Sequence, residues 1–138
     1  MILYRCGTSC PVGEIPPSNW ATNSIALEYF IDRCEERGLD CGDKILVLEI
    51  PAQSPADIGP YCRINGRKVD GDPAHPFGDD KDGWWSFNQP YSGPFRVIDV
   101  LSLKGLSMTD IDLLDTRYKP REEWPKGVLA LVERLARK

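Results

Sequence analysis

Residues 19–50 read NWATNSIALEYFIDRCEERGLDCGDKILVLEI, and they decide the fold because they hold the two clearest elements of the chain. Apolar residues recur there at i, i+3, i+4 and i+7, a spacing that predicts an amphipathic helix. Its apolar face consists of Leu27, Phe30, Ile31 and Cys34. The polar side chains that can cap its start are those of Thr22, Asn23 and Ser24. Gly38 supplies a left-handed stop, and the apolar run at 45–48 predicts a central strand covered on both faces.

Segments on either side complete an α+β pattern. A β-prone run at 2–5 predicts a first strand, and further strands are expected at 61–64, 67–69, 84–87 and 95–101. The Asn65-Gly66 pair predicts a hairpin turn between the strands at 61–64 and 67–69. We expect one domain over 1–138 with mixed or antiparallel strands: a core at 2–103, a linker with short elements at 104–125, and a C-terminal helix at 126–138.

Composition and charge limit the class of protein. The chain has 138 residues, 41% hydrophobic and 28% charged, as in an ordinary soluble domain. A net charge of −4 gives no indication of a surface that binds nucleic acid. Apolar runs are too short to span a membrane, and the first residues lack the pattern of a signal peptide. We therefore expect a cytoplasmic protein.

The cysteines do not predict a metal site. Their number is odd, which fits a disulfide framework poorly, and their spacings differ from those of structural zinc sites. They are Cys6, Cys10, Cys34, Cys41 and Cys62. Reduced, partly buried thiols are the expected state. The Asp-rich segment at 70–83 lacks the spacing of a calcium loop, so a solvated acidic loop is expected there.

The order of the elements resembles the mono-ADP-ribosyltransferase-like fold family, in particular its small bacterial and phage members. The resemblance is carried by Tyr4-Arg5 at the end of the first strand, by Trp20-Ala21-Thr22 before a helix with Ala26 and Tyr29, and by the strand VLEIPA at 47–52. It covers roughly residues 2–103. It implies a split β-sheet that holds NAD, or another nucleotide containing ADP-ribose, in a cleft.

The resemblance also implies a set of binding residues. Arg5 would contact the dinucleotide, a role that suits a bidentate guanidinium. Trp20 or Tyr29 would offer an aromatic face to the nicotinamide ring. The Ser/Thr segment that supports the nicotinamide ribose corresponds to Thr22, Asn23 and Ser24. Tyr4 belongs to the first motif, although it has no implied role beyond packing.

One departure from the family concerns catalysis. Active members place a glutamate shortly before the last strand, where its charge steadies an oxocarbenium-like transition state. This chain has no acidic residue between Asp82 and Asp99. Gln89, which we assign to the catalytic position together with Arg5, can hydrogen-bond a ribose hydroxyl but cannot stabilise positive charge. The chain is thus an altered transferase, a nucleotide-binding relic or an unrelated protein.

Two other interpretations use the same residues. In a structural interpretation, the aromatic residues fill the core, Arg5 forms a salt bridge and Thr22 caps a helix. In a binding interpretation, the chain is a small acidic inhibitor or accessory factor without catalytic activity. It would then present the loop at 70–83, with Trp84 and Trp85, to a protein partner, because exposed tryptophans often anchor interfaces.

Overall fold

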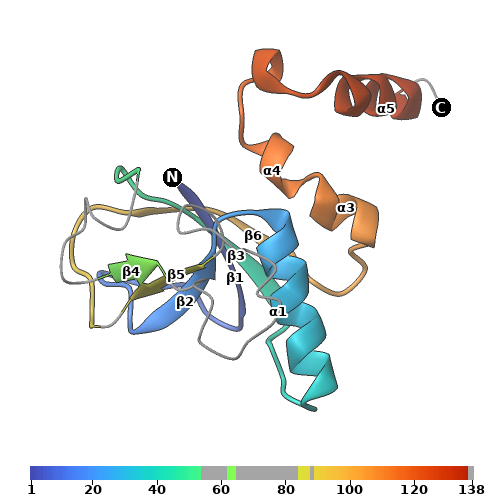
Figure 1. Cartoon of the computed structure of the whole chain (residues 1–138). Coiled ribbons are helices and arrows are strands. Elements are labelled where there is room, and N and C mark those ends of the chain that lie inside the picture. Colours follow the sequence, from blue (N-terminus) through green and yellow to red (C-terminus); the bar gives the residue numbers. More distant parts are fainter. Residues whose placement is uncertain (54–61, 65–83, 88, 137–138) are drawn as a thin grey trace.

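The strands form an antiparallel sheet in the computed structural model, which describes residues 1–53, 62–64, 84–87 and 89–136 (Figure 1). Their order in the sheet is β4-β5-β2-β1-β3-β6. The strands are β1 (Ile2–Gly7), β2 (Ser18–Ala21), β3 (Lys44–Glu49), β4 (Cys62–Ile64), β5 (Trp84–Phe87) and β6 (Arg96–Ser102). The helices are α1 (Ser24–Glu36), α3 (Met108–Asp112), α4 (Leu114–Arg117) and α5 (Lys126–Ala136), with a 3-10 turn η2 (Arg121–Glu123). This confirms the predicted α+β class.

Local sequence explains both ends of α1. Asn23 is the cap, since its side-chain oxygen accepts from the Ala26 backbone N–H at 2.9 Å. Gly38 adopts the expected left-handed conformation, with φ of 64°. On the predicted apolar face, Leu27 and Cys34 are buried, whereas Phe30 and Ile31 are only half-buried. The helix was therefore predicted correctly.

The strand β3 is central, as predicted, and lies between β1 and β6. Its side chains alternate between the two faces of the sheet. Ile45 and Val47 join a core that includes α1, α3 and α4, and this face is called the helix face below. Leu46 and Leu48 join a second core with the buried residues Leu3, Ile15, Trp20, Ile50, Trp85, Phe87 and Tyr91, and this face is called the loop face.

The sheet has two three-stranded parts joined at a narrow point. The strand β1 pairs with β3 along its whole length, from Ile2↔Glu49 to Gly7↔Lys44. Its register with β2 on the other side consists of Tyr4↔Ala21. The parts β4-β5-β2 and β1-β3-β6 therefore meet where β1 passes β2, within one six-stranded sheet.

Polar contacts fasten the short helices to the helix face. The Asp115 carboxylate accepts from the Ser24 backbone N–H at 2.8 Å and from the Ser24 hydroxyl at 2.7 Å. The Tyr4 hydroxyl donates to the Leu114 carbonyl at 3.1 Å. Because Ser24 begins α1 and Tyr4 lies on β1, these bonds connect the start of the chain to the segment after β6.

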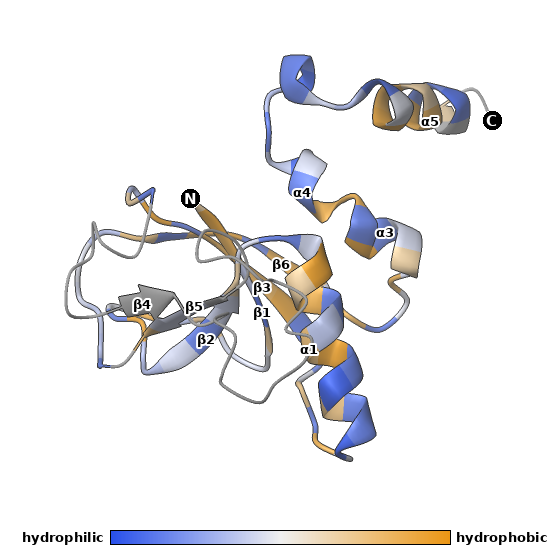
Figure 2. Cartoon of the chain, in the orientation of Figure 1, coloured by the Kyte–Doolittle hydropathy of each residue, from blue (hydrophilic) through white to orange (hydrophobic). Residues whose placement is uncertain are grey.

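The C-terminal helix α5 extends away from the sheet (Figure 1). Apolar and polar residues lie on different sides of it (Figure 2). Neither core includes any described residue of α5. No described helix is both long and apolar enough to cross a membrane.

The strand β2 corrects one expectation. Its first residue was assigned to a loop and its remaining residues to a polar entry into α1, yet Ser18–Ala21 pairs with β5 from Ser18↔Phe87 to Ala21↔Trp84. The predicted hairpin turn at Asn65-Gly66, the strand at 67–69 and the acidic loop at 70–83 lie outside the described residues.

Candidate functional site

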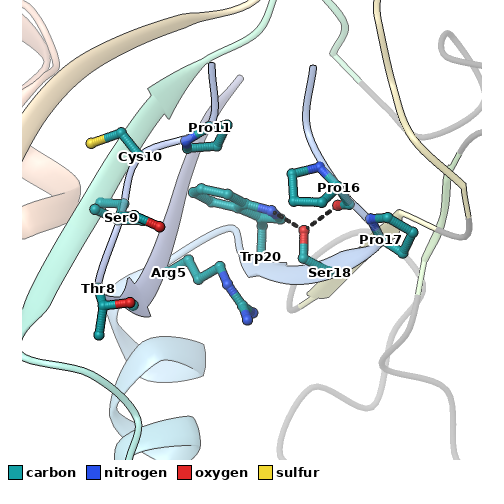
Figure 3. Close-up of a pocket in the computed structure, with 11 residues that line it drawn as sticks. Arg5, Thr8, Ser9, Cys10, Pro11, Pro16, Pro17, Ser18 and Trp20 are labelled. Carbon is teal, nitrogen blue, oxygen red and sulfur yellow. Dashed lines mark hydrogen bonds between the residues drawn. The ribbon is translucent and has the colours of Figure 1, made fainter. Parts of the chain in front are cut away.

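A cavity of about 270 Å³ opens between the end of β1, the loop at 8–17 and the start of β2 (Figure 3). It lies on the loop face, beside the narrow junction of the sheet. Its polar and aromatic lining comes from Arg5, Thr8, Ser9, Cys10, Ser18 and Trp20. Arg5 and Trp20 were predicted from the sequence to share a site, and they do line one cavity.

Trp20 forms a fixed wall of this cavity. Its indole N–H donates to the Ser18 hydroxyl at 2.9 Å, and that hydroxyl donates to the Pro16 carbonyl at 2.6 Å (Figure 3). The Trp20 side chain is only 1% exposed. The prediction that it offers an open aromatic face to a nicotinamide ring is therefore wrong, because its ring is enclosed by the core.

Arg5 supplies the positive charge of the cavity. Its side chain is half-buried and donates to the Asn19 carbonyl at 2.9 Å. Burial lowers the pKa of its guanidinium, although an arginine stays protonated in proteins at neutral pH. Among the described residues, no carboxylate forms an ion pair with it. Its hydrogen-bond partner in the described part of the chain is a neutral carbonyl, and a partly desolvated cation in such a setting is a favourable place for an anion.

The predicted Ser/Thr segment lies elsewhere. Tyr4, Thr22 and Asn23 line a separate cavity of about 410 Å³ on the helix face, together with Asp115 and other residues. Asn23 is the cap of α1. The backbone N–H and the hydroxyl of Ser24 both donate to the Asp115 carboxylate. The structure therefore does not bring these four residues to Arg5. Strand alternation is the reason, because Tyr4 and Arg5 are neighbours on β1 and face opposite sides.

Two further predicted residues line neither cavity. Tyr29 lies on α1, half-buried, with the Arg33 guanidinium 5.9 Å from its ring centroid. Gln89 is exposed just after β5. The pairing of Arg5 with Gln89 as catalytic residues therefore gains no support from the cavity lining.

The loop at 8–17 contributes residues for which sequence analysis gave no role. Thr8, Ser9 and Cys10 line the cavity because β1 ends at Gly7 and the chain turns beside Arg5. Lys44 also approaches this loop, since its ammonium donates to the Thr8 carbonyl at 3.4 Å. A run of hydroxyl residues directly after the Arg5 strand was the available signal.

The side chain of Trp85 corrects the alternative binding interpretation. It is 1% exposed and packs in the core of the loop face, so it cannot anchor a partner at the surface. The side chain of Trp84 and the acidic loop lie outside the described residues. No group of three or more His, Cys, Asp or Glu side chains within the described residues could hold a metal ion.

Comparisons with known proteins add no relative. No protein-family model matches the chain, and no curated protein or solved structure matches it. Function is therefore argued from the cavity itself. It combines one cation, hydroxyl groups and a rigid wall, and its described lining contains no carboxylate. Such a lining can bind and orient an anionic group.

Proposed function

We propose that this chain binds NAD or another nucleotide containing ADP-ribose through the Arg5 cavity, with transferase activity altered or lost. The observation that carries the proposal is the half-buried Arg5 guanidinium, which has no carboxylate partner in the described part of the chain. The order of motifs that resembles the ADP-ribosyltransferase-like family favours a dinucleotide over other anions.

Chemistry of the lining supports a phosphate-centred mode of binding. A guanidinium presents paired N–H donors that match two phosphate oxygens. The hydroxyls of Thr8 and Ser9 line the same cavity and can donate to further oxygens of the pyrophosphate or an adjoining ribose. The Lys44 ammonium contacts the Thr8 carbonyl nearby, but it is also ion-paired with the Asp43 carboxylate at 3.1 Å, so Arg5 remains the principal cation of the site. Arg5 would thus hold the ligand as a charge-paired anchor.

Cavity size limits how much of the ligand is enclosed. A volume of about 270 Å³ falls just below the roughly 300–1,000 Å³ typical of cavities that enclose a drug-sized ligand. In this proposal the pyrophosphate with an adjoining ribose would occupy the cavity, because the cation and the hydroxyls line it, and the bases would remain outside. Among the described residues, no carboxylate lines the cavity to stabilise an oxocarbenium-like transition state. Binding without rapid release of nicotinamide is the expected behaviour.

Thermal melting with NAD and with ADP-ribose, each at a concentration 100 times its Kd, tests the proposal. A ligand that binds only the folded state then adds about 2.7 kcal/mol, or several degrees for a domain of this size. Arg5→Ala should abolish the shift. Arg96→Ala is the matched control, because Arg96 pairs with Glu49 at an exposed site on β6 and should leave the shift unchanged.

Three outcomes would contradict the proposal. Equal shifts in the native chain and in Arg5→Ala would place any bound nucleotide outside this cavity. Saturating shifts with inorganic pyrophosphate but none with NAD would show a simple anion site. Rapid release of nicotinamide, measured by chromatography, would contradict the expected loss of catalytic activity.

A further inference from the structure

The C-terminal helix α5 has two chemically different sides. Its half-buried side chains recur at i, i+1, i+3 and i+4 and therefore share one side of the helix; they are Val128, Leu129, Leu131 and Val132. Its exposed side chains recur at i, i+4, i+7 and i+8 and share the opposite side; they are Lys126, Ala130, Glu133 and Arg134. Figure 2 shows the same separation of apolar from polar residues. We refer to the first four residues as the α5 stripe.

The sheet does not cover the α5 stripe. No described residue of α5 belongs to either core or packs against one, and the helix extends away from both faces of the sheet (Figure 1). The stripe therefore remains partly exposed to water. Because removing apolar surface from water is favourable, a partner that covers the stripe would gain free energy.

The charge of this segment differs in sign from that of the rest of the chain. Four of its side chains are basic and one is acidic over 126–138, namely Lys126, Arg134, Arg137 and Lys138 against Glu133. Its side-chain charge is therefore +3, and since the whole chain has −4, residues 1–125 carry −7. The helix dipole favours a cation in the last turn, such as Arg134, but it disfavours Lys126 in the first turn. The dipole alone thus does not account for the basic residues, and an anionic partner does.

Trp124 adds an aromatic side chain just before α5. Its side chain is half-buried, and its indole N–H donates to the Lys119 carbonyl at 3.0 Å. The Arg121 guanidinium lies 6.0 Å from its ring centroid. Tryptophan, with an apolar ring and one polar N–H, is enriched where lipid chains meet water. The segment therefore combines apolar, aromatic and basic side chains within a short length of chain.

We propose that α5 binds the anionic surface of a lipid bilayer. The α5 stripe would lie between the headgroups and the acyl chains, and the basic side would face the headgroup phosphates, as in other amphipathic helices that lie in the plane of a membrane. The helix has 11 residues and measures about 16 Å, roughly half the thickness of the hydrocarbon core. It would therefore lie on the bilayer and not cross it.

The two sides of α5 together favour lipid over other anionic partners. A nucleic acid would pair with the basic side chains but would leave the α5 stripe in water. A bilayer with anionic headgroups satisfies both sides at once, because it offers negative charge at its surface and an apolar layer directly beneath. The proposal is independent of nucleotide binding at the Arg5 cavity.

Co-sedimentation of the full chain with lipid vesicles tests this proposal. One set of vesicles contains equal parts of phosphatidylserine and phosphatidylcholine, and the other contains phosphatidylcholine alone. We expect the chain to sediment with the first set and not with the second. Raising the ionic strength from about 0.1 M to about 1 M shortens the Debye length from about 10 Å to about 3 Å, so the bound fraction should fall.

Variants of α5 show which side chains make the contact. Leu131→Asp places a charge in the α5 stripe and should weaken binding by roughly tenfold or more. Arg134→Ala should weaken it by about fivefold, which corresponds to about 1 kcal/mol for one basic residue near the surface. Arg96→Ala is the matched control, because it removes an exposed basic residue from β6 and should leave binding unchanged. Since α5 lies outside both cores, its variants should melt like the native chain.

Several results would overturn the proposal. They include a failure of the native chain to sediment with phosphatidylserine vesicles and equal sedimentation with both sets of vesicles. Unchanged binding in Leu131→Asp would place the lipid contact outside the α5 stripe. Self-association in analytical ultracentrifugation that is lost in Leu131→Asp, without any binding to vesicles, would assign the stripe to a second copy of the chain. The comparison of the two sets of vesicles needs only the native chain, so it holds even where a variant folds poorly.

Discussion

The two faces of the sheet are buried in different ways. The helix face is covered by α1, α3 and α4, and its polar groups are paired, as in the bonds from Ser24 to Asp115 and from Tyr4 to the Leu114 carbonyl. The loop face is covered in part by irregular segments that carry Ile15 and Tyr91, and a cavity with the cation of Arg5 opens there. A cavity also opens on the helix face, where Tyr4, Thr22 and Asn23 line it, so the two faces differ in the chemistry of their cavities. The candidate site is the cavity on the loop face, because the half-buried cation of Arg5 lines it.

The largest loss of stability should come from substituting alanine for one core residue on each face of β3. Ile45 and Leu48 are both fully buried, on the helix face and the loop face respectively. Each substitution to alanine should lower the free energy of unfolding by about 2–5 kcal/mol. Ile45→Ala should cost more, because packed helices collapse into a new cavity less readily than loops do. Urea denaturation measures both, and a larger loss in Leu48→Ala would contradict the comparison.

Removing the Asp115 carboxylate should break the fastening of α4 to α1. Asp115→Ala leaves the Ser24 backbone N–H without its acceptor, which costs about 1–3 kcal/mol for a group out of contact with water. Glu133→Gln on exposed α5 is the control and should change stability by no more than about 0.5 kcal/mol. Equal effects of the two substitutions, measured by urea denaturation, would show that the bond is not structural.

Tyr4→Phe should produce a smaller loss with a dependence on pH. The hydroxyl donates to the Leu114 carbonyl, so its removal should cost about 0.5–1.5 kcal/mol at neutral pH. Burial raises the pKa of Tyr4 in the folded state. Above a pH of about 10 the unfolded chain loses this proton and the folded chain keeps it, so stability falls as pH rises. Melting between neutral and alkaline pH should show a shallower decline for Tyr4→Phe than for the native chain.

The smallest change in the free energy of unfolding should come from a substitution in α5. Leu131 lies on a half-buried stripe of this helix, which extends away from both faces of the sheet. Leu131→Ser should change the free energy of unfolding of the sheet by about 0.5 kcal/mol or less. A loss comparable to that of Ile45→Ala would mean that α5 packs on the sheet in solution, and near-ultraviolet circular dichroism of the buried tryptophans would report it.

Elements with a strong local pattern were predicted well. The helix after residue 23, the central strand at 45–48 and the strand near 96–101 all appear where their apolar periodicity places them. The strand β2 was missed because four residues are too few to show an alternating pattern. The site residues were predicted less well. Tyr4 shares a motif with Arg5, and Thr22 shares one with Trp20, yet Tyr4 and Thr22 line another cavity.

The sequence by itself determined the local structure of this protein. Periodicity, the Asn23 cap and the Gly38 stop act between residues close along the chain, so they can be recognised without the fold. Only the tertiary structure decided that Arg5 and Trp20 share a cavity and that Asp115 bonds Ser24 from 91 residues away. These contacts depend on strand order and on the face to which each side chain points. Both are set by packing of the whole chain, which no single motif encodes.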